Sequence, residues 1–228
     1  MQTYLFNFST IQKAFSVRNF FIYTAANGIS LIGMWAQRLS VGWLIWDLTE
    51  SATWLGAIAM AEFLPILFLT PLGGVIADRY NRLSIAKISQ IVTCLISLCL
   101  CILTFSNQVT PFILFFIMLI AGTINALNQA SRVSLVVNMV PRELMTPAIA
   151  INSVIFNLAR IVGPAIGGLL ISKSSVAWAF LFSTMTFTIL LVALNMILMS
   201  DKSDKEKKNQ FELKDLYKGV SFIINNNS

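Results

Sequence analysis

The sequence contains no histidine, and charged residues make up only 11% of its 228 positions. Soluble domains carry roughly a quarter charged residues, so most of this chain is not expected to face water. The absence of histidine excludes a serine hydrolase that relies on a histidine base. No paired-carboxylate motif indicates a metal-dependent lipid transferase. We therefore predict that the chain is not an enzyme and holds neither a metal ion nor a cofactor.

Cysteine is scarce as well. Cys94, Cys99 and Cys101 lie in one apolar run, and no cysteine elsewhere is available to pair with them. A disulfide framework and a zinc site are therefore not expected. We interpret the three residues as small apolar side chains of a helix.

Long apolar runs are abundant, since 57% of the residues are hydrophobic. A helix that crosses a bilayer needs about 20 consecutive apolar residues. The runs predict six membrane-spanning helices at 20–46, 53–77, 84–105, 109–132, 145–172 and 175–199. The predicted fold class is an all-α membrane protein, with the helical bundle in 1–199. The segment 200–228 is predicted to be a charged cytoplasmic linker that ends in a short amphipathic helix on the membrane surface.

Lysine and arginine are distributed unevenly along a chain whose net charge is +6. They form short clusters between the apolar runs, as cytoplasmic loops do, so nucleic acid is not an expected partner. One side of the predicted bundle carries Lys13, Arg18, Arg79, Arg82, Lys87, Arg132, Arg142 and the lysines beyond residue 200, whereas the other carries only Lys173. This asymmetry predicts that both termini are cytoplasmic. A tryptophan belt near the outer interface would then comprise Trp43, Trp46, Trp54 and Trp178.

The turn after the second run holds a first motif, with Gly74, Asp78, Arg79 and Arg82 at its key positions. Glycine lets helices approach closely, and Asn81 tolerates the left-handed backbone of a tight turn. The segment resembles the signature loop of the major facilitator superfamily, G-x-x-x-D-R-x-x-R-R/K, which implies a gating latch formed by Asp78 and the arginines. It departs from that motif at Leu83, where the family has a basic residue. The alternative is a generic basic loop that only marks topology.

The fifth run holds a second motif, Gly163-Pro164-Ala165-Ile166-Gly167-Gly168. It resembles the G-P-x-x-G-G motif of drug and metabolite exporters in the same superfamily. Pro164 removes one backbone donor and can kink the helix, while Gly163 and Gly167 offer a small face to a neighbouring helix. The alternative is plain helix packing without a functional role.

Longer stretches resemble the branch of the superfamily that includes enterobactin-exporter-like and macrolide-efflux-like proteins. They are 16–20, 48–51, 140–144, 152–153 and 156–160. The resemblance implies twelve helices in two bundles, of which this chain is the N-terminal one, built as two three-helix inverted repeats. It also implies a bacterial inner-membrane exporter that uses protons and carries a small amphipathic compound such as a drug or siderophore. The family is about twice this length, so a second half or a partner would complete the transporter. Alternatively, the chain is a truncated or split half without transport of its own.

Polar residues inside the runs mark a candidate substrate and ion pathway. A charge at the bilayer centre costs about 2.5–3.5 kcal/mol on insertion scales. The candidates are the charged Arg38, Glu62 and Arg160, with Asn27, Met34, Asn125, Asn128, Gln129 and Asn157, which form stripes on single helices. Such stripes face a bundle interior or an aqueous cavity, although they also serve as polar contacts between helices.

Arg38 and Glu62 are expected to form an ion pair. Their runs are consecutive, and at 1.5 Å per residue both lie roughly 12–14 Å below the outer end. Pairing offsets part of the cost of burying each charge. Protonation of Glu62 would release Arg38, which suggests coupling to protons or to an anionic substrate group; the alternative is a static structural pair. The third run has a weakly polar stripe, including Gln90, Ser97 and Cys101, that we interpret mainly as helix packing.

Overall fold

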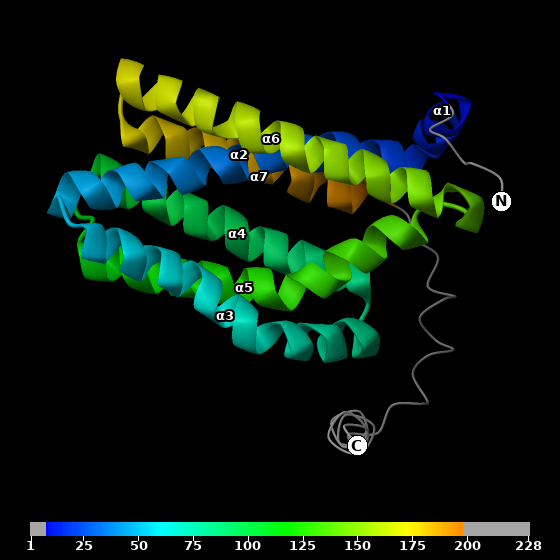
Figure 1. The fold of residues 1–228 in the computed structure, drawn as a ribbon, viewed down its shortest axis with the longest axis horizontal. Helices are drawn as coiled ribbons and strands as arrows, with labels where there is room; N and C mark the ends of the chain where they lie inside the picture. Colours follow the sequence, from blue (N-terminus) through cyan, green and yellow to red (C-terminus); the bar gives the residue numbers. More distant parts are fainter. Residues whose placement is uncertain (1–7, 198–228) are drawn as a thin grey trace, which may run out of the picture.

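The computed structural model describes residues 8–197, which form helices joined by short turns (Figure 1). The elements are α1 (Phe8–Ser16), α2 (Arg18–Thr49), α3 (Ala52–Arg79), α4 (Arg82–Phe105), α5 (Pro111–Asn138), the short 3-10 helix η1 (Arg142–Leu144), α6 (Met145–Lys173) and α7 (Val176–Met196). The prediction of an all-α fold is confirmed for this part of the chain. The predicted linker and amphipathic helix at 200–228 lie outside the described residues.

Each predicted run lies mainly in one long helix, in the order α2 to α7. Within the described residues, five helices are long and apolar enough to cross a membrane, and they are α3 to α7. The remaining long helix, α2, has 32 residues but carries buried Asn27 and Gln37 and the charged Arg38. A membrane-spanning role for α2, which would complete six spans, stays a prediction.

Two features of the fold depart from the predicted boundaries. Helix α5 continues to Asn138, past the predicted end at Arg132, because the Arg132 side chain is partly buried in the bundle interior instead of marking a turn. Helix α1 was not predicted, and its apolar residues Ile11 and Ala14 belong to a core cluster at one end of the bundle. The charged residue Arg132 therefore does not mark the end of a helix at the surface, as the sequence had suggested.

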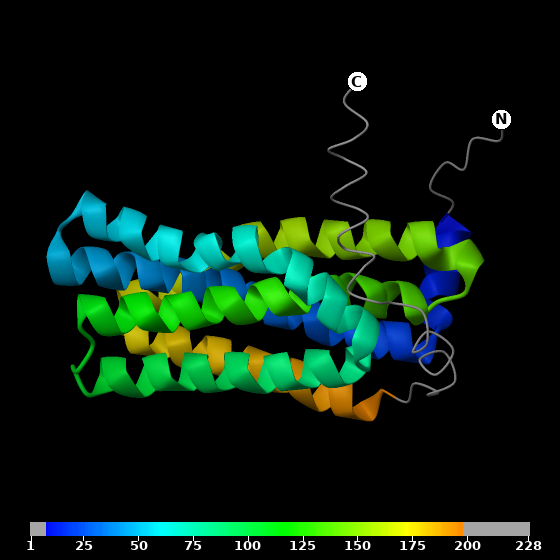
Figure 2. The ribbon, with the colours of Figure 1, turned by 90° about the horizontal axis from the view of Figure 1, so that it is seen from below.

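The long helices form two groups that α4 joins. Helix α2 packs along both α6 and α7, helix α3 packs along α5, and α4 contacts α5 and α7. Figures 1 and 2 show these helices running side by side in an elongated bundle. One apolar core, around Phe20 and Leu135, fills one end of the bundle, and another, around Ile45 and Phe180, fills the other. The described chain starts and finishes at the first of these ends (Figure 1), while the inverted-repeat arrangement stays a prediction.

Hydrogen bonds between helices fix α4 against α7. Three side chains of α4 donate to main-chain carbonyl oxygens of α7: Gln90 to Phe187 at 3.1 Å, Ser97 to Phe180 at 3.2 Å and Cys101 to Ala177 at 3.7 Å. On another side of α7, the Ser183 hydroxyl donates to the Gly33 carbonyl of α2 at 2.8 Å. Gln90, Ser97 and Cys101 of the third run therefore pack α4 against α7, as predicted.

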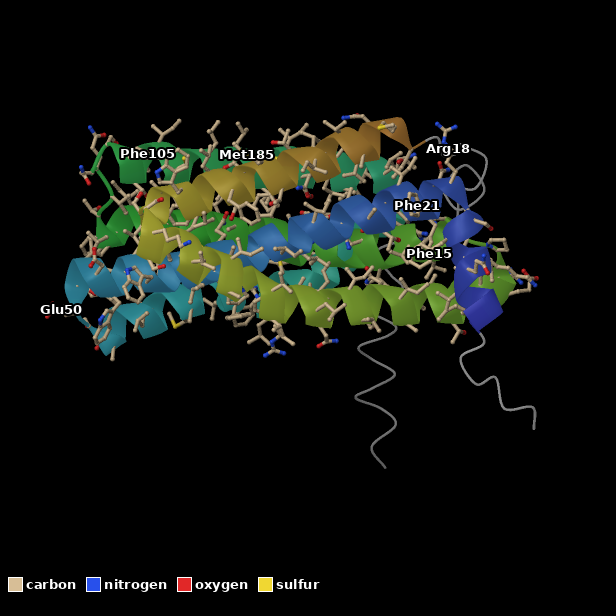
Figure 3. All side chains as sticks on the ribbon, turned by 90° about the horizontal axis from the view of Figure 1, so that it is seen from above. Phe15, Arg18, Phe21, Glu50, Phe105 and Met185 are labelled. Carbon is tan, nitrogen blue, oxygen red and sulfur yellow. The ribbon has the colours of Figure 1, made fainter. Side chains whose placement is uncertain are left out.

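Large apolar side chains cover the outside of the bundle. Leu67 is 72% exposed and Ile161 is 73% exposed. Figure 3 shows exposed Met185 on the outer side, between the end marked by Arg18 and the end marked by Glu50 and Phe105. Monomeric soluble proteins rarely expose apolar patches of this extent, so the surface suits contact with lipid.

Four tryptophans belong to helix ends near Glu50 and Phe105, which Figure 3 labels at one end of the bundle. Trp43 and Trp46 lie near the end of α2, Trp54 near the start of α3 and Trp178 near the start of α7. Trp178 packs edge-on against Phe105, with ring centres 5.9 Å apart. The four residues therefore share one end, and the assignment of that end to the outer interface stays a prediction.

The turn between α3 and α4 corrects the expectation of a left-handed backbone at Asn81. Its φ of −60° and ψ of 118° are extended, and its side chain caps α4. The Asn81 side-chain oxygen accepts hydrogen bonds from the backbone N–H groups of Leu83 and Ser84 at 2.9 and 3.1 Å, which satisfies two otherwise unpaired donors. Asp78 and Arg79 lie in the last turn of α3, but their side chains are outside the described part, so the latch stays a prediction.

Candidate translocation site

The predicted ion pair between α2 and α3 is present. Arg38 Nη2 lies 2.6 Å from Glu62 Oε1, and Arg38 Nε donates to the same oxygen at 2.8 Å. The Arg38 side chain is 24% exposed and that of Glu62 is 12% exposed, so both charges are largely removed from solvent. The predicted contact between these two charges is therefore confirmed, while their depth in the membrane stays a prediction.

Two glycines of the α3–α5 seam set the position of Glu62. A side chain at Gly122 would collide with the Glu62 carbonyl oxygen, and one at Gly73 would lie 2.7 Å from the Ala126 carbonyl oxygen. The absence of side chains at both positions lets the two backbones touch. Gly74, which belongs to the signature loop, has open space around it and takes no part in this contact.

Trp35 lies next to the ion pair and links it to α6. The guanidinium carbons of Arg38 and Arg160 lie 4.9 and 5.5 Å from the centre of its ring. Phe156 of α6 packs edge-on against the same ring at 5.8 Å, and Arg38 also lies 5.3 Å from the ring centre of Phe63. These distances are in the range of cation–π attraction. Two of the three predicted intramembrane charges therefore share one aromatic ring.

The glycines of the second motif bring α6 against α2 at Trp35. A β-carbon at Gly163 would lie 2.5 Å from Trp35 Cβ and 2.6 Å from the Ile32 carbonyl oxygen. One at Gly167 would lie 3.1 Å from Ala36 Cα. Gly168 is not confined, since its nearest obstacle would be Leu39 Cδ2 at 3.7 Å. The motif thus provides close helix packing, and this packing positions Trp35 beside Arg160.

A cavity of about 50 Å³ lies beside the ion pair, between α2, α3, α4, α5 and α7. Its lining includes five of the predicted pathway residues, which are Met34, Arg38, Glu62, Asn125 and Asn128. A cavity of this size holds a few water molecules when its walls are polar. Asn128 Oδ1 and Gln37 Oε1 are buried and have no hydrogen-bond partner among the described residues. The cavity therefore has walls of mixed polar and apolar character and lies next to the Glu62 carboxylate.

Sequence reasoning missed part of this lining. Gln37 directly precedes Arg38 in the chain, yet it was not included among the candidates. Gln90 was interpreted mainly as a packing residue, whereas Arg132 shares a helix stripe with Asn125 and Asn128 and was also counted on the basic side of the bundle. A polar residue next to an intramembrane arginine is the signal that would have identified Gln37.

The other predicted pathway residues lie outside this cavity. Asn27 is buried, and its side chain donates to Asn152 Oδ1 of α6 at 3.3 Å, which is a contact between helices. Gln129, Asn157 and Arg160 are exposed on the bundle surface. Asn157 donates to the Ser153 carbonyl of its own helix at 2.8 Å. The structure therefore separates the candidates into a cavity set and a surface set.

A bundle of long apolar helices with an apolar outer surface and an internal charge pair defines a multi-pass membrane protein. The sequence matches the family described as a transmembrane secretion effector over residues 11–223. The chain therefore belongs to this family of the major facilitator superfamily, as its motifs predicted.

The curated relatives are transporters by name. The staphyloferrin A transporter of Staphylococcus aureus is 24% identical over 168 residues, which cover 73% of this chain and 42% of that protein. The enterobactin exporter EntS of Shigella boydii is 26% identical over 226 residues, which cover 98% and 52%. The uncharacterized MFS-type transporter YfiS of Bacillus subtilis is 24% identical over 203 residues, which cover 87% and 48%. The chain spans about half the length of these relatives, and no solved structure matches it.

Proposed function

We propose that this chain is the N-terminal half of a proton-coupled transporter that exports small amphipathic compounds, such as drugs or siderophores, from bacteria. Family membership and the names of the relatives support transport as the activity. In this proposal the chain lies in the inner membrane with both termini in the cytoplasm. The uneven distribution of lysine and arginine supports that orientation.

The Arg38–Glu62 pair carries the proposal. An internal ion pair adds little to stability, because desolvating two charges consumes most of their attraction. Packing alone would be served as well by apolar residues, so the pair calls for a functional explanation. Protonation of Glu62 would remove the partner of Arg38, which would then be available to another anion. The neighbouring cavity, which Asn125 and Asn128 also line, supports the proposal because it has room for water beside the carboxylate.

The exposed polar stripe of α6 supports the proposal that its face of the bundle borders the pathway. Asn157 and Arg160 are exposed, and Arg160 lies near the middle of this helix. A charge at that depth is costly in lipid, so the stripe is better placed against an aqueous path or a second bundle. In the proposed transporter, this face meets the second six-helix half, and substrate passes between the halves.

Charge exchange tests the proposed role of the pair. In a transporter completed by its second half, Arg38→Gln and Glu62→Gln should each abolish export from an efflux-deficient host. The double variant Arg38→Glu with Glu62→Arg should recover part of it if the pair itself matters. Lys173→Gln, at the end of α6, serves as the control and should export normally. Normal export by both single variants would contradict the proposal.

A second candidate is a half that does not transport by itself. It is favoured by the coverage of relatives, since the chain matches 52% of the enterobactin exporter. Rocking in this fold moves one bundle against another around a central site, and one bundle offers no counterpart. Expression of residues 1–228 alone should then leave drug and siderophore sensitivity unchanged, and supply of the second half as a separate chain should change it. Export by 1–228 alone would contradict this candidate, unless a homodimer is detected.

A further inference from the structure

The side chains around Trp35 contain more cationic groups than anionic groups. We call this group of residues the Trp35 cluster; it consists of Trp35, Arg38, Glu62, Phe156 and Arg160. It holds two guanidinium groups and one carboxylate, and Arg38 alone is paired with that carboxylate. Among the described residues, Arg160 forms no ion pair and rests on the Trp35 ring. The cluster therefore carries a net positive charge on a face that also offers aromatic surface.

A third donor belongs to the same cluster. Trp35 Nε1 is buried and has no hydrogen-bond partner among the residues that the structure describes. A buried indole N–H usually has a partner, and one without it is costly. A negatively charged oxygen is the acceptor that the unpaired Arg160 guanidinium would bind most strongly.

The aromatic residues limit what kind of anion fits. Phe156 meets Trp35 edge-on at an interplanar angle of 70° and is 38% exposed, so part of its ring is accessible on the side of α6 that carries Arg160. Arginine binds carboxylates in a planar, bidentate manner and also stacks on aromatic rings. A ligand with a carboxylate on a flat or aromatic body would use both kinds of surface.

We propose that the Trp35 cluster is the site at which the transporter binds the carboxylate of a flat or aromatic organic acid, with Arg160 as the primary anion ligand. The assignment of this acid as the transported compound rests on the proposed function. Arg38 is the second ligand, and it becomes available when Glu62 is neutralised. Substrate carboxylate and Glu62 therefore compete for the same guanidinium group.

Three compounds of nearly equal shape and different charge test the proposal. Benzoate is anionic, benzamide is neutral and benzamidinium is cationic. The experiment uses a variant of the full 228-residue chain in nanodiscs, in which phenylalanine replaces the other four tryptophans and Trp35 is the single one left. Quenching of Trp35 fluorescence then reports binding at the cluster, without any transport measurement.

Benzoate should bind at least about tenfold more tightly than benzamide, which is the contribution of one charge-assisted hydrogen bond, and benzamidinium should bind least. Arg160→Gln should remove this preference, Arg160→Lys should keep part of it, and Lys173→Gln should keep all of it. Glu62→Gln should strengthen benzoate binding, because it frees Arg38.

Equal binding of benzoate and benzamide, or an unchanged preference in Arg160→Gln, would overturn the assignment. Thermal unfolding of each variant separates loss of the site from loss of the fold, and Arg160→Lys retains a cation if Arg160→Gln does not fold. Preference for benzoate together with absence of export in the completed transporter would refute the proposed function and leave the anion site in place.

Discussion

The glycine at the α2–α6 contact provides a sharp test of how the second motif works. A β-carbon at Gly163 would lie 2.5 Å from Trp35 Cβ and 2.6 Å from the Ile32 carbonyl oxygen. Neither obstacle is the end of a flexible side chain, so neither can rotate away. Gly163→Ala must therefore move the two helices apart by roughly 1 Å to restore ordinary contact distances.

The magnitude of the effect follows from two opposing contributions. Overpacking of this kind costs about 1–3 kcal/mol, whereas alanine in place of glycine stabilises a helix by about 1 kcal/mol. We expect Gly163→Ala to lower the free energy of unfolding by up to about 2 kcal/mol. The shift should also weaken the contact between Arg160 and Trp35, which now lie 5.5 Å apart.

Gly168→Ala is the matched control in the same motif. Its β-carbon would meet only Leu39 Cδ2 at 3.7 Å, which is an ordinary contact, so it should leave stability equal or raise it by about 1 kcal/mol. Thermal unfolding in detergent compares the two variants, and fluorescence of the single-tryptophan chain reports exposure of Trp35. Equal stability of Gly163→Ala and Gly168→Ala would refute the role of Gly163 in setting this contact.

Three further predictions concern the charge pair, the topology and the latch. Glu62→Gln should lower the free energy of unfolding by about 1–3 kcal/mol, because Arg38 is left partly buried without its partner. The double variant with Arg38→Gln should recover part of that loss, and chemical unfolding measures both. A cysteine introduced at Ser51 should react with a membrane-impermeant maleimide added to intact cells, and one at Asn81 should not; the reverse pattern would invert the topology. In a completed transporter, Asp78→Asn should impair export with normal membrane insertion by immunoblot, whereas normal export would reduce the motif to a topology signal.

The helices were predictable because apolar runs of sufficient length have few alternatives to a buried or membrane-spanning helix. The ion pair was predictable because consecutive antiparallel helices place residues of equal depth side by side. Five residues of the cavity lining were predictable from their charge or their place in a polar stripe on a single helix, whereas Gln90 reaches the cavity only through the way α4 packs, which no single-helix pattern contains. The role of Gly122 likewise depends on its partner, Glu62, on another helix. Asn81 was misjudged because asparagine suits both a left-handed turn and a helix cap.

The α4–α7 hydrogen bonds bear on which parts of the bundle are free to move. Each donor on α4 meets one particular main-chain oxygen, so a slip of one helical turn, about 5.4 Å, would break all three bonds together. Helix α2 is held to the same pair of helices through Ser183 and Gly33.

The α3–α5 seam is built differently. Among the side chains that the structure describes, no hydrogen bond joins these two helices. Instead, the backbone of Gly73 lies against Ala126 of α5, and the backbone of Gly122 lies against Glu62 of α3. Each glycine receives the backbone of the other helix at one position, so this seam fixes the register of its helices by shape instead of by hydrogen bonds. We therefore expect α4 and α7 to move as one unit with α2 attached, and α3 and α5, which carry Glu62, to move as another.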